Sequence, residues 1–573
     1  MPDAGGGKGV RMDRKWWTLI AVCTGTFMLL LDITVVNVAL PDIQRSLHSS
    51  FADLQWVVDA YALTLAAFLL TAGVVGDMFG RRRVFAIGVV VFSLSSLLCG
   101  LSTSALMLNL SRAAQGVGGA VMFATSLALI AQAFAGRERG TAFGIYGAVL
   151  GGAMAVGPLV GGAITSGIGW RWIFFVNLPL GVVAVVICLA RVRDSRDPMR
   201  RRIDWTGFVT FSTSLFLLVY ALVQGNAKGW SSPTIVGLLA GSGVLMVVFL
   251  VAERLQRDPM LDLKLFRRPA MDGVSLAAFT LSASIFALFL YLTLYLQDVL
   301  GYGPFATGLR LLPVTVLAFV VAPVAGKLTV RIHSRYLLGT GLLLVAVGCG
   351  LMTGVRADSA WTVLLPGFIV SGIGIGITNP VLASATVSVV PPERSGMATG
   401  SSSTFRQVGI ATGVAGLGAV FLNQIRTNTV SALTASAAGQ GVLAHGGSRL
   451  NAAITGSGIH DAAAALPGAG ARQALISAYR SGFATTLDRL MVVGMFIAFA
   501  GAVGSLVLVR QQDFVPSFSP AELEPASVAS PPAPPRPRHA HSKRRRPRAK
   551  RLGAPVPPTG RARQTTGSPS ASG

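Results

Sequence analysis

The chain alternates between long runs of apolar residues and short polar links. Fourteen of the runs are long enough to cross a bilayer as an α-helix, which takes roughly 20 residues. We therefore expect an all-α polytopic membrane protein with 14 transmembrane helices. The expected spans lie at about 17–40, 54–75, 84–101, 106–132, 139–163, 173–190, 206–223, 234–252, 272–296, 305–325, 336–354, 361–382, 398–421 and 489–509.

The order of the spans predicts two six-helix bundles with two extra helices between them. Between the last two spans the chain is rich in Ala, Gly, Ser and Thr, which favours a long external loop. The C-terminal tail is rich in Pro, Ser and Arg, which favours disorder. In chain order the expected parts are a cytoplasmic N-terminus (1–16), the N-terminal bundle (17–192), the extra helices (203–253), the C-terminal bundle (269–509) with its external loop (422–488), and a basic cytoplasmic tail (510–573).

Charge is scarce in this chain and unevenly placed. Only 12% of the residues are charged, against about 25% in soluble domains. Most Lys and Arg residues lie in every second link and in the tail, and this alternation places both termini in the cytoplasm. The net charge of +25 therefore indicates contact of the tail with the anionic inner leaflet, and no nucleic-acid partner. A solvated tail that only helps to set the topology is the alternative.

The link after the second span begins with glycine and is strongly basic. Asp77 lies there between two glycines, and it could cap the N-terminus of a neighbouring helix or pair with an arginine. Either contact would hold one state of a gate; charges that only fix topology explain the arginines but not Asp77. A fainter basic link at 326–335 has the equivalent place in the second bundle. The candidate gating residues are Gly73, Asp77, Gly80, Arg81, Arg82 and Arg83.

Ionisable residues inside the spans are few, and a charge there costs at least about 2.5 kcal/mol. Asp32 lies past the middle of the first span, where a carboxyl group can bind and release a proton unless it faces the outer headgroups. Arg112 shares a helix face with Gln115 and Gly116, so it points into a helix interface. Its expected partners are Asp32 and the more exposed Asp59. An Asp–Arg pair that breaks on protonation would couple protons to transport, whereas a fixed pair would only stabilise the fold.

Two further spans carry residues of interest. The fifth span has small residues at i, i+4 spacing, typical of close helix packing, and a Gly-Pro step that permits a bend. Arg406, in the thirteenth span, lies nearer the cytoplasmic end and could simply extend to the headgroups. The candidate residues of the fifth span are Gly157, Pro158, Gly161 and Gly162.

No pattern in the chain indicates an enzyme. The phosphate-binding pattern Gly-x4-Gly-Lys-Ser/Thr is missing, which argues against direct use of ATP. The four cysteines lie in apolar runs without metal-ligand spacing, and the six histidines lie outside the spans. We therefore expect no cofactor and no metal, with a proton gradient as the source of energy.

Five motifs, in the right order and on the right helices, together resemble those of the fourteen-helix drug:proton antiporters of the major facilitator superfamily. The resemblance covers residues 14 to about 510. It implies that Asp32 and Arg112 couple protons, that the fifth helix controls leak and direction, and that the link after the second helix gates. The motifs are Leu31–Pro41, Gly73–Arg83, Leu108–Gly119, Gly157–Gly162 and Trp170–Gly181.

These observations lead to one expected function and two alternatives. We expect a monomeric carrier in the cell membrane that exports drugs or other hydrophobic or amphipathic small molecules by alternating access, coupled to protons. The nearest alternative is a dedicated exporter of one endogenous metabolite or antibiotic, which would confer self-resistance. A more distant alternative is a membrane scaffold or sensor that does not transport.

Overall fold

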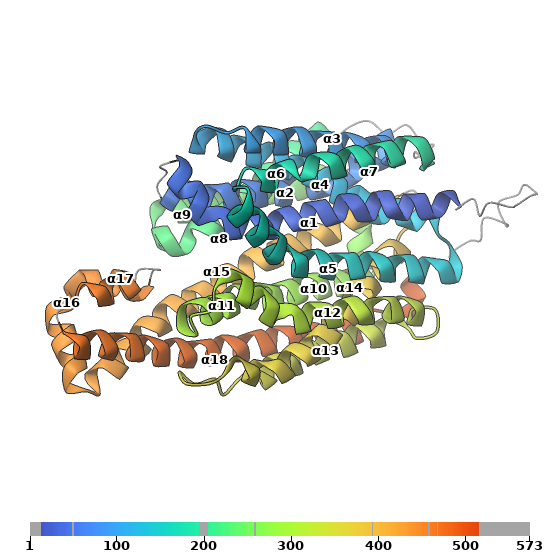
Figure 1. The fold of residues 1–573 in the computed structure, drawn as a ribbon. Helices are drawn as coiled ribbons and strands as arrows, with labels where there is room; N and C mark the ends of the chain where they lie inside the picture. Colours follow the sequence, from blue (N-terminus) through green and yellow to red (C-terminus); the bar gives the residue numbers. More distant parts are fainter. Residues whose placement is uncertain are drawn as a thin grey trace, which may run out of the picture. The chain divides into compact units, whose positions relative to one another are not determined.

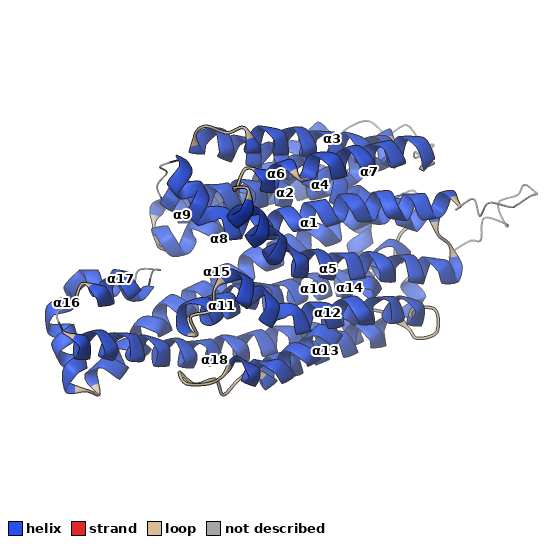
Figure 2. Cartoon of the chain, in the orientation of Figure 1, coloured by secondary structure: helices blue, strands red, loops and turns tan. Residues whose placement is uncertain are grey.

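The computed structural model describes residues 13–47, 51–193, 204–256, 259, 261–391, 394–455, 459–466 and 468–514. By contacts the chain divides into two units, Met1–Pro520 and Ala521–Gly573, and all described residues belong to the first. Within the described ranges the regular structure is helical throughout (Figure 2). The all-helical prediction is therefore confirmed, whereas most of the expected disordered tail lies outside the described residues.

The helices of the first bundle follow the expected spans. Gly80 separates the second and third helices, and its φ of +102° is a conformation that glycine adopts without strain. The fourth helix begins where the Ser104 hydroxyl accepts a hydrogen bond from the backbone N–H of Met107, at 3.3 Å. The elements are α1 (Arg14–Leu47), α2 (Phe51–Phe79), α3 (Arg81–Gly100), α4 (Ala105–Ala133), α5 (Gly136–Gly167), α6 (Trp172–Phe175) and α7 (Asn177–Arg191).

The two extra helices pack against each other. The side chain of Asp204 caps the first of them and that of Ser232 caps the second. Between them, the hydroxyls of Ser214 and Ser242 each donate to the other's carbonyl oxygen at 2.8 Å. The first extra helix also contacts the second helix of the chain and the long helix that begins at Ser395. The two helices are α8 (Trp205–Lys228) and α9 (Pro233–Leu255).

The C-terminal part of the chain begins with one continuous helix that changes its winding twice. Two π-helical segments interrupt the α-helix over Pro269–Val299. The elements are η1 (Leu263–Arg267), α10 (Pro269–Leu281), η2 (Ser282–Phe286), α11 (Ala287–Leu294), η3 (Tyr295–Val299), α12 (Pro304–Leu328), α13 (Ser334–Leu351), η4 (Trp361–Leu364), α14 (Leu365–Ser388), α15 (Ser395–Thr434), α16 (Ala437–Thr455), α17 (Ile459–Ala464), α18 (Ala469–Leu508) and η6 (Gln511–Asp513).

In the described part of the chain, 13 helices are long and apolar enough to cross a membrane by length and composition. They coincide with 13 of the 14 expected spans. The remaining expected span, 139–163, falls on α5, a helix of 32 residues that is not among the 13. At a rise of about 1.5 Å per residue, α5 is nonetheless longer than the apolar thickness of a bilayer.

The segment at 422–488 differs from the expected irregular loop, because much of it is helical. α15 continues to Thr434, α16 and α17 follow, and α18 begins at Ala469. Alanine has the highest intrinsic helix propensity, which explains why an Ala-rich segment forms helices. The segment also buries Leu433, Val442 and Leu475 in the main core of the C-terminal bundle. Its apolar positions therefore pack against protein.

The bundles contact each other most extensively through two pairs of helices. α5 of the first bundle packs along α12 of the second (Figure 1), and α2 packs along α15. Smaller contacts join α14 to α4 and α5, and α15 to α4. Each bundle has its own apolar core, and a third core cluster joins residues of α2, α8, α9, α10 and α15. The extra helices thus share a core with both bundles.

Candidate functional site

Asp32 and Arg112 meet inside the first bundle. Asp32 lies on α1 and Arg112 on α4, and their exposed fractions are only 2% and 1%. The Arg112 Nη1 atom donates to Asp32 Oδ2, which makes a buried ion pair. Arg112 also donates from Nε to the Val57 carbonyl oxygen at 2.9 Å and from Nη1 to Gln115 Oε1 at 2.8 Å. Asp32 therefore does not face the headgroups, and the carboxylate has a fixed cation beside it.

Two amide side chains complete the shell around the Asp32 carboxylate. Gln115 Nε2 donates to Asp32 Oδ1 at 2.9 Å, and Asn177 Nδ2 donates to the same oxygen at 3.1 Å. Asn177 also donates to the Ser96 hydroxyl at 3.0 Å, and Ser96 in turn donates to the carbonyl oxygen of Phe174 at 2.9 Å. Asp32 thus accepts from three side chains that come from α4 and α7.

Asn177 is a member of this site that residue-level reasoning missed. It is the first residue of α7, directly after the short helix α6. An amide inside the apolar run that begins near residue 173 was the available signal, because a buried amide must find hydrogen-bond partners. Its partner could not be chosen from spacing, since α1 and α7 are far apart in the sequence.

Aromatic rings and a glycine position Arg112. The guanidinium carbon lies 4.3 Å from the ring centroid of Tyr61 and 6.0 Å from that of Phe174. A Cβ atom on Gly116 would overlap the Thr64 hydroxyl, so a side chain there would push α4 away from α2. The face of α4 that carries Arg112 therefore packs closely on α2, as its spacing predicts.

The structure does not bring Asp59 into this network. Asp59 lies on α2 and is half-buried, and its Oδ2 atom is buried without a hydrogen-bond partner. The carboxylate that pairs with Arg112 is that of Asp32. Of the two acids expected as partners of Arg112, the geometry selects Asp32.

Asp77 joins the two bundles. It is buried near the end of α2, and it accepts from Arg81 Nε at 2.9 Å and from Arg81 Nη2 at 2.8 Å. Its two oxygens also accept from the backbone N–H groups of Gly396 and Met397, at 3.1 and 3.0 Å. These groups belong to the first turn of α15, where a negative charge is favourable. Both contacts considered for Asp77, the helix cap and the arginine pair, are therefore present together.

Glycines let the bundles touch backbone to backbone at two places. A Cβ atom on Gly73 would overlap the carbonyl oxygen of Gly396, where α2 meets α15. A Cβ atom on Gly140 would likewise overlap the carbonyl oxygen of Gly326, where α5 meets α12. The second contact involves the link at 326–335 that resembles the first in sequence. Glycine at these positions permits an approach that no other residue allows.

The other two arginines of the candidate gating stretch have less connected positions. Arg82 Nη1 donates to the Val192 carbonyl oxygen at 3.2 Å, which ties the start of α3 to the end of α7. Arg83 is exposed. The hydrogen bonds from this stretch to α15 are those that Asp77 accepts, and Arg81 pairs with Asp77.

On α5, two of the four candidate residues pack against α1 close to Asp32. A Cβ atom on Gly157 would overlap the Thr34 hydroxyl, and one on Gly161 would lie 3.1 Å from the Cα atom of Val35. A Cβ atom on Gly162 would meet no heavy atom within 4 Å. The helix runs through Pro158 without ending there. α5 therefore contacts α1 within one turn of Asp32.

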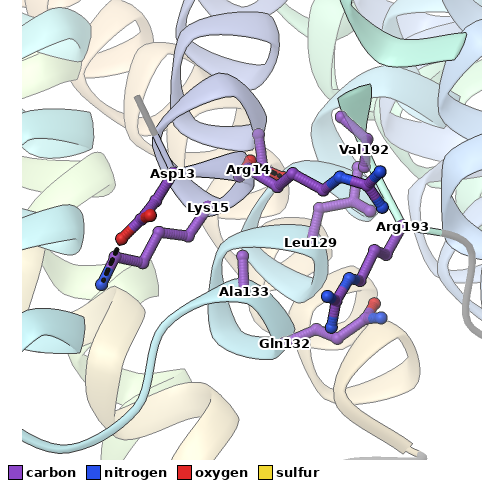
Figure 3. Close-up of a pocket in the computed structure, with 9 residues that line it drawn as sticks. Asp13, Arg14, Lys15, Leu129, Gln132, Ala133, Val192 and Arg193 are labelled. Carbon is purple, nitrogen blue, oxygen red and sulfur yellow. Dashed lines mark hydrogen bonds and ion pairs between the residues drawn. The ribbon is translucent and has the colours of Figure 1, made fainter. Parts of the chain in front are cut away.

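Two surface pockets lie outside this network. One, of about 410 Å³, lies at the start of α1 and the end of α4, with Arg14, Lys15 and Arg193 around it (Figure 3). Lys15 there pairs with Asp13 at 3.4 Å and with Glu138 of α5 at 2.9 Å. The other, of about 400 Å³, lies between α2, α4 and α8 and is lined mainly by apolar side chains. Neither pocket includes Asp32 or Asp77.

Comparison with known proteins agrees with this arrangement. The family profile of the Major Facilitator Superfamily matches residues 22–414, which include both bundle contacts and the Asp32 site. The chain belongs to this family. It is therefore a multi-pass membrane transporter, and the expected fold class and family are confirmed.

Several relatives are resistance or export proteins of bacteria. The chain is 38% identical over 404 residues to the multidrug resistance protein Stp of Mycobacterium tuberculosis. The matched residues make up 70% of this chain and 75% of Stp. It is 39% identical over 428 residues to the puromycin resistance protein pur8 of Streptomyces alboniger, and the matched residues make up 74% of this chain and 84% of pur8. The transporter is thus related to drug-resistance exporters.

A solved structure supports the fold alone. The proton:xylose symporter XylE, bound to 6-bromo-6-deoxy-D-glucose, matches with a TM-score of 0.57 at 12% identity, over 87% of this chain and 96% of that chain. At this identity the likeness carries the helical arrangement of the family and nothing about substrate or coupling.

Proposed function

We propose that this transporter exports amphipathic small molecules, drugs among them, in exchange for protons. The observation that carries the proposal is the buried Asp32–Arg112 pair, because an acid enclosed by a cation and two amides inside a bundle is suited to exchange protons. Neither cofactor nor metal is needed for this cycle. The energy comes from the proton gradient.

The coupling step is the loss and return of the negative charge on Asp32. In the structure the Asp32 carboxyl group accepts hydrogen bonds from Arg112, Gln115 and Asn177, an arrangement that suits a carboxylate. A proton on the carboxyl group weakens all three contacts at once. Arg112 then retains its bonds to Val57 and Gln115, and the polar contacts that hold α1 to α4 and α7 at Asp32 are loosened.

Movement of α1 has a direct route to the contact between bundles. Thr34 and Val35, two and three residues after Asp32, pack on Gly157 and Gly161 of α5. α5 in turn packs along α12 of the second bundle. We infer that protonation of Asp32 shifts the rocking equilibrium of the bundles through α5. This is our account of the role of the fifth helix in direction and leak.

Asp77 is the proposed gate residue. Its contacts to Arg81 and to the first turn of α15 hold the ends of α2 and α15 together in this state. Alternating access requires these contacts to break, and the distribution of arginines predicts that this stretch lies on the cytoplasmic side. Gly73 and Gly80 allow the close approach and the sharp link that the gate needs.

The names of the relatives leave two export functions to compare. Stp is named for resistance to many drugs and pur8 for resistance to puromycin. We favour multidrug export, and a dedicated exporter of one endogenous metabolite or antibiotic is the second candidate. Growth of a pump-deficient host on unrelated toxic compounds separates them, since a dedicated exporter protects against one compound class only.

The test of the proposal is drug accumulation in a pump-deficient host, with and without a protonophore. Cells that express the protein should accumulate less drug than control cells, and the protonophore should abolish the difference. Accumulation that stays low after the proton gradient has collapsed would reject proton-driven export.

A further inference from the structure

Arg406 is a cation inside the helices that the proton site and the gate do not use. It lies on α15, eleven residues after Ser395, which is about 16 Å along the helix axis. Its guanidinium carbon lies 5.2 Å from the ring centroid of Phe286, and it interacts electrostatically with Tyr146. Tyr146 is buried on α5 of the other bundle. The expectation that Arg406 extends to the headgroups is therefore wrong.

Arg406 lacks a fixed anionic partner. Among the described residues, no ion pair and no hydrogen bond engages its guanidinium group. Arg112, which is more deeply buried, has a carboxylate, a carbonyl oxygen and an amide oxygen as partners. The two internal arginines thus differ in their counter-charge. Arg112 is neutralised by Asp32, whereas no carboxylate of the described residues pairs with Arg406.

An internal cation without a counter-charge is unfavourable unless something else supplies the charge. Its desolvation costs several kcal/mol, and such residues in membrane proteins mark the paths of ions and substrates. Arg406 is only partly buried, so a ligand can reach it. The planar guanidinium group presents paired N–H donors that match the two oxygens of a carboxylate.

Aromatic groups surround the cation. Phe286 and Phe289 contact each other edge to face, with ring centroids 6.0 Å apart. Phe286 ends the π-helical segment η2, and such segments are frequent at functional sites. From the other bundle comes the buried hydroxyl of Tyr146, which also lies near Thr26 of α1. The site thus offers one cation, two apolar rings and one phenolic hydroxyl.

We propose that Arg406 binds the anionic group of the exported molecule, and that the substrates include amphipathic aromatic carboxylates. Phe286 and Phe289 contact the apolar part of such a molecule, while Tyr146 can donate to one of its oxygens. This proposal rests on the proposed export function and adds the charge of the substrate to it. Because Arg406 and Tyr146 lie on different bundles, a bound anion would contact both halves of the carrier.

The test compares two xanthene dyes of opposite charge on purified protein in proteoliposomes. Fluorescein is anionic near neutral pH, and tetramethylrhodamine methyl ester is cationic. Arg406→Gln should weaken fluorescein binding roughly 10- to 100-fold relative to the cationic dye, since it removes a charge-assisted hydrogen bond. Arg406→Lys, which keeps the charge without the planar fork, should lie between wild type and Arg406→Gln.

Arg426→Gln is the matched control. Arg426 lies on the same helix and is exposed, and its substitution by Gln removes the same charge. The ratio of the two dye affinities should stay within about twofold of wild type in this control, because surface charges are screened. Equal ratios in Arg406→Gln and Arg426→Gln would overturn the proposal, and so would a wild-type protein that binds the cationic dye but not fluorescein.

Proton-driven transport is measured in the same vesicles, so the two proposals can fail separately. One outcome would reject the anion site and leave the exporter proposal intact. In that outcome the proton gradient drives transport of the cationic dye, and Arg406→Gln does not change dye selectivity. Selective loss of fluorescein binding in Arg406→Gln would support the anion site by itself. If the pH gradient then drives transport of neither dye, the exporter proposal would fail while the anion site stands.

Discussion

At the scale of single residues, the surroundings of Asp32 distinguish this acid from the others in the chain. It accepts from Arg112, Gln115 and Asn177, whereas Asp59 has a buried oxygen without a partner. The scarcity of charges inside apolar runs limited the expected partners of Arg112 to Asp32 and Asp59, and the structure shows that Asp32 is the partner. Nothing in the sequence ranked Asn177, because its role depends on the approach of α7 to α1.

We predict that Asn177→Ala slows coupled transport without abolishing substrate binding. The variant leaves Asp32 Oδ1 with Gln115 as its remaining amide donor and removes the donor to Ser96. The expected loss of stability is about 1–2 kcal/mol. The measurements are the maximal transport rate, the substrate affinity and the thermal midpoint of the purified protein.

Asn423→Ala, at an exposed position of α15, is the control for this change and should behave as wild type. A weakened substrate affinity at an unchanged maximal rate in Asn177→Ala would place Asn177 in substrate binding and contradict its role as a positioning residue for Asp32.

At the scale of elements, the contact between bundles depends on pairs of glycines in different helices. The repeated basic links predicted that Gly73 and the 326 region are equivalent. Their partners, Gly396 and Gly140, could not be predicted, because small residues occur along many faces of these helices. Asp77 is a similar case: its cap on a helix N-terminus was one of two considered contacts, and only the fold shows that the helix is α15.

Gly396→Ala is predicted to destabilise the state in which α2 and α15 are in contact. The added methyl group would overlap the Gly73 carbonyl oxygen and crowd Asp77, and overpacking of this kind costs about 1–3 kcal/mol. Spin labels on the ends of α2 and α15 should therefore report a larger fraction of long distances than in the unaltered protein.

Gly416→Ala is the appropriate comparison, because it lies on the same helix and a Cβ there meets nothing within 4 Å. Distance distributions that are identical in Gly396→Ala and Gly416→Ala would mean that the glycine contact does not hold this state.

Two features of the helices could not be predicted from the pattern of apolar residues. The segment at 422–488 was expected to be a loop because it is rich in Ala, Gly, Ser and Thr, yet it forms α16, α17 and the extensions of α15 and α18. The π-helical turns at Ser282–Phe286 and Tyr295–Val299 leave no trace in the pattern of apolar residues.

At the scale of the whole molecule, the expected spans each fall on a helix, and the family is the one that the motifs indicated. Long apolar runs are the strongest signal a sequence carries, because a bilayer requires about 20 apolar residues per helix. Orientation in the membrane, the monomeric state and the place of the basic tail near the inner leaflet stay predictions.

Removal of residues 521–573 should leave export intact. The deletion spares Asp513, whose carboxylate accepts from the Ala270 N–H at 3.1 Å at the start of α10. The expected result is drug accumulation equal to that of the full-length protein at matched membrane levels. Complete loss of export in a deletion variant that still inserts would favour the scaffold or sensor alternative, in which the tail recruits a partner.

The most direct test of the central claim is proton movement driven by substrate in proteoliposomes that carry a pH-sensitive dye. Wild-type protein should move protons when a gradient of a transported drug is applied. Asp32→Asn keeps the size of the side chain but cannot exchange a proton, so it should bind the drug and move no protons. Drug-driven proton movement at the wild-type rate in Asp32→Asn would contradict the assignment of Asp32 as the coupling residue.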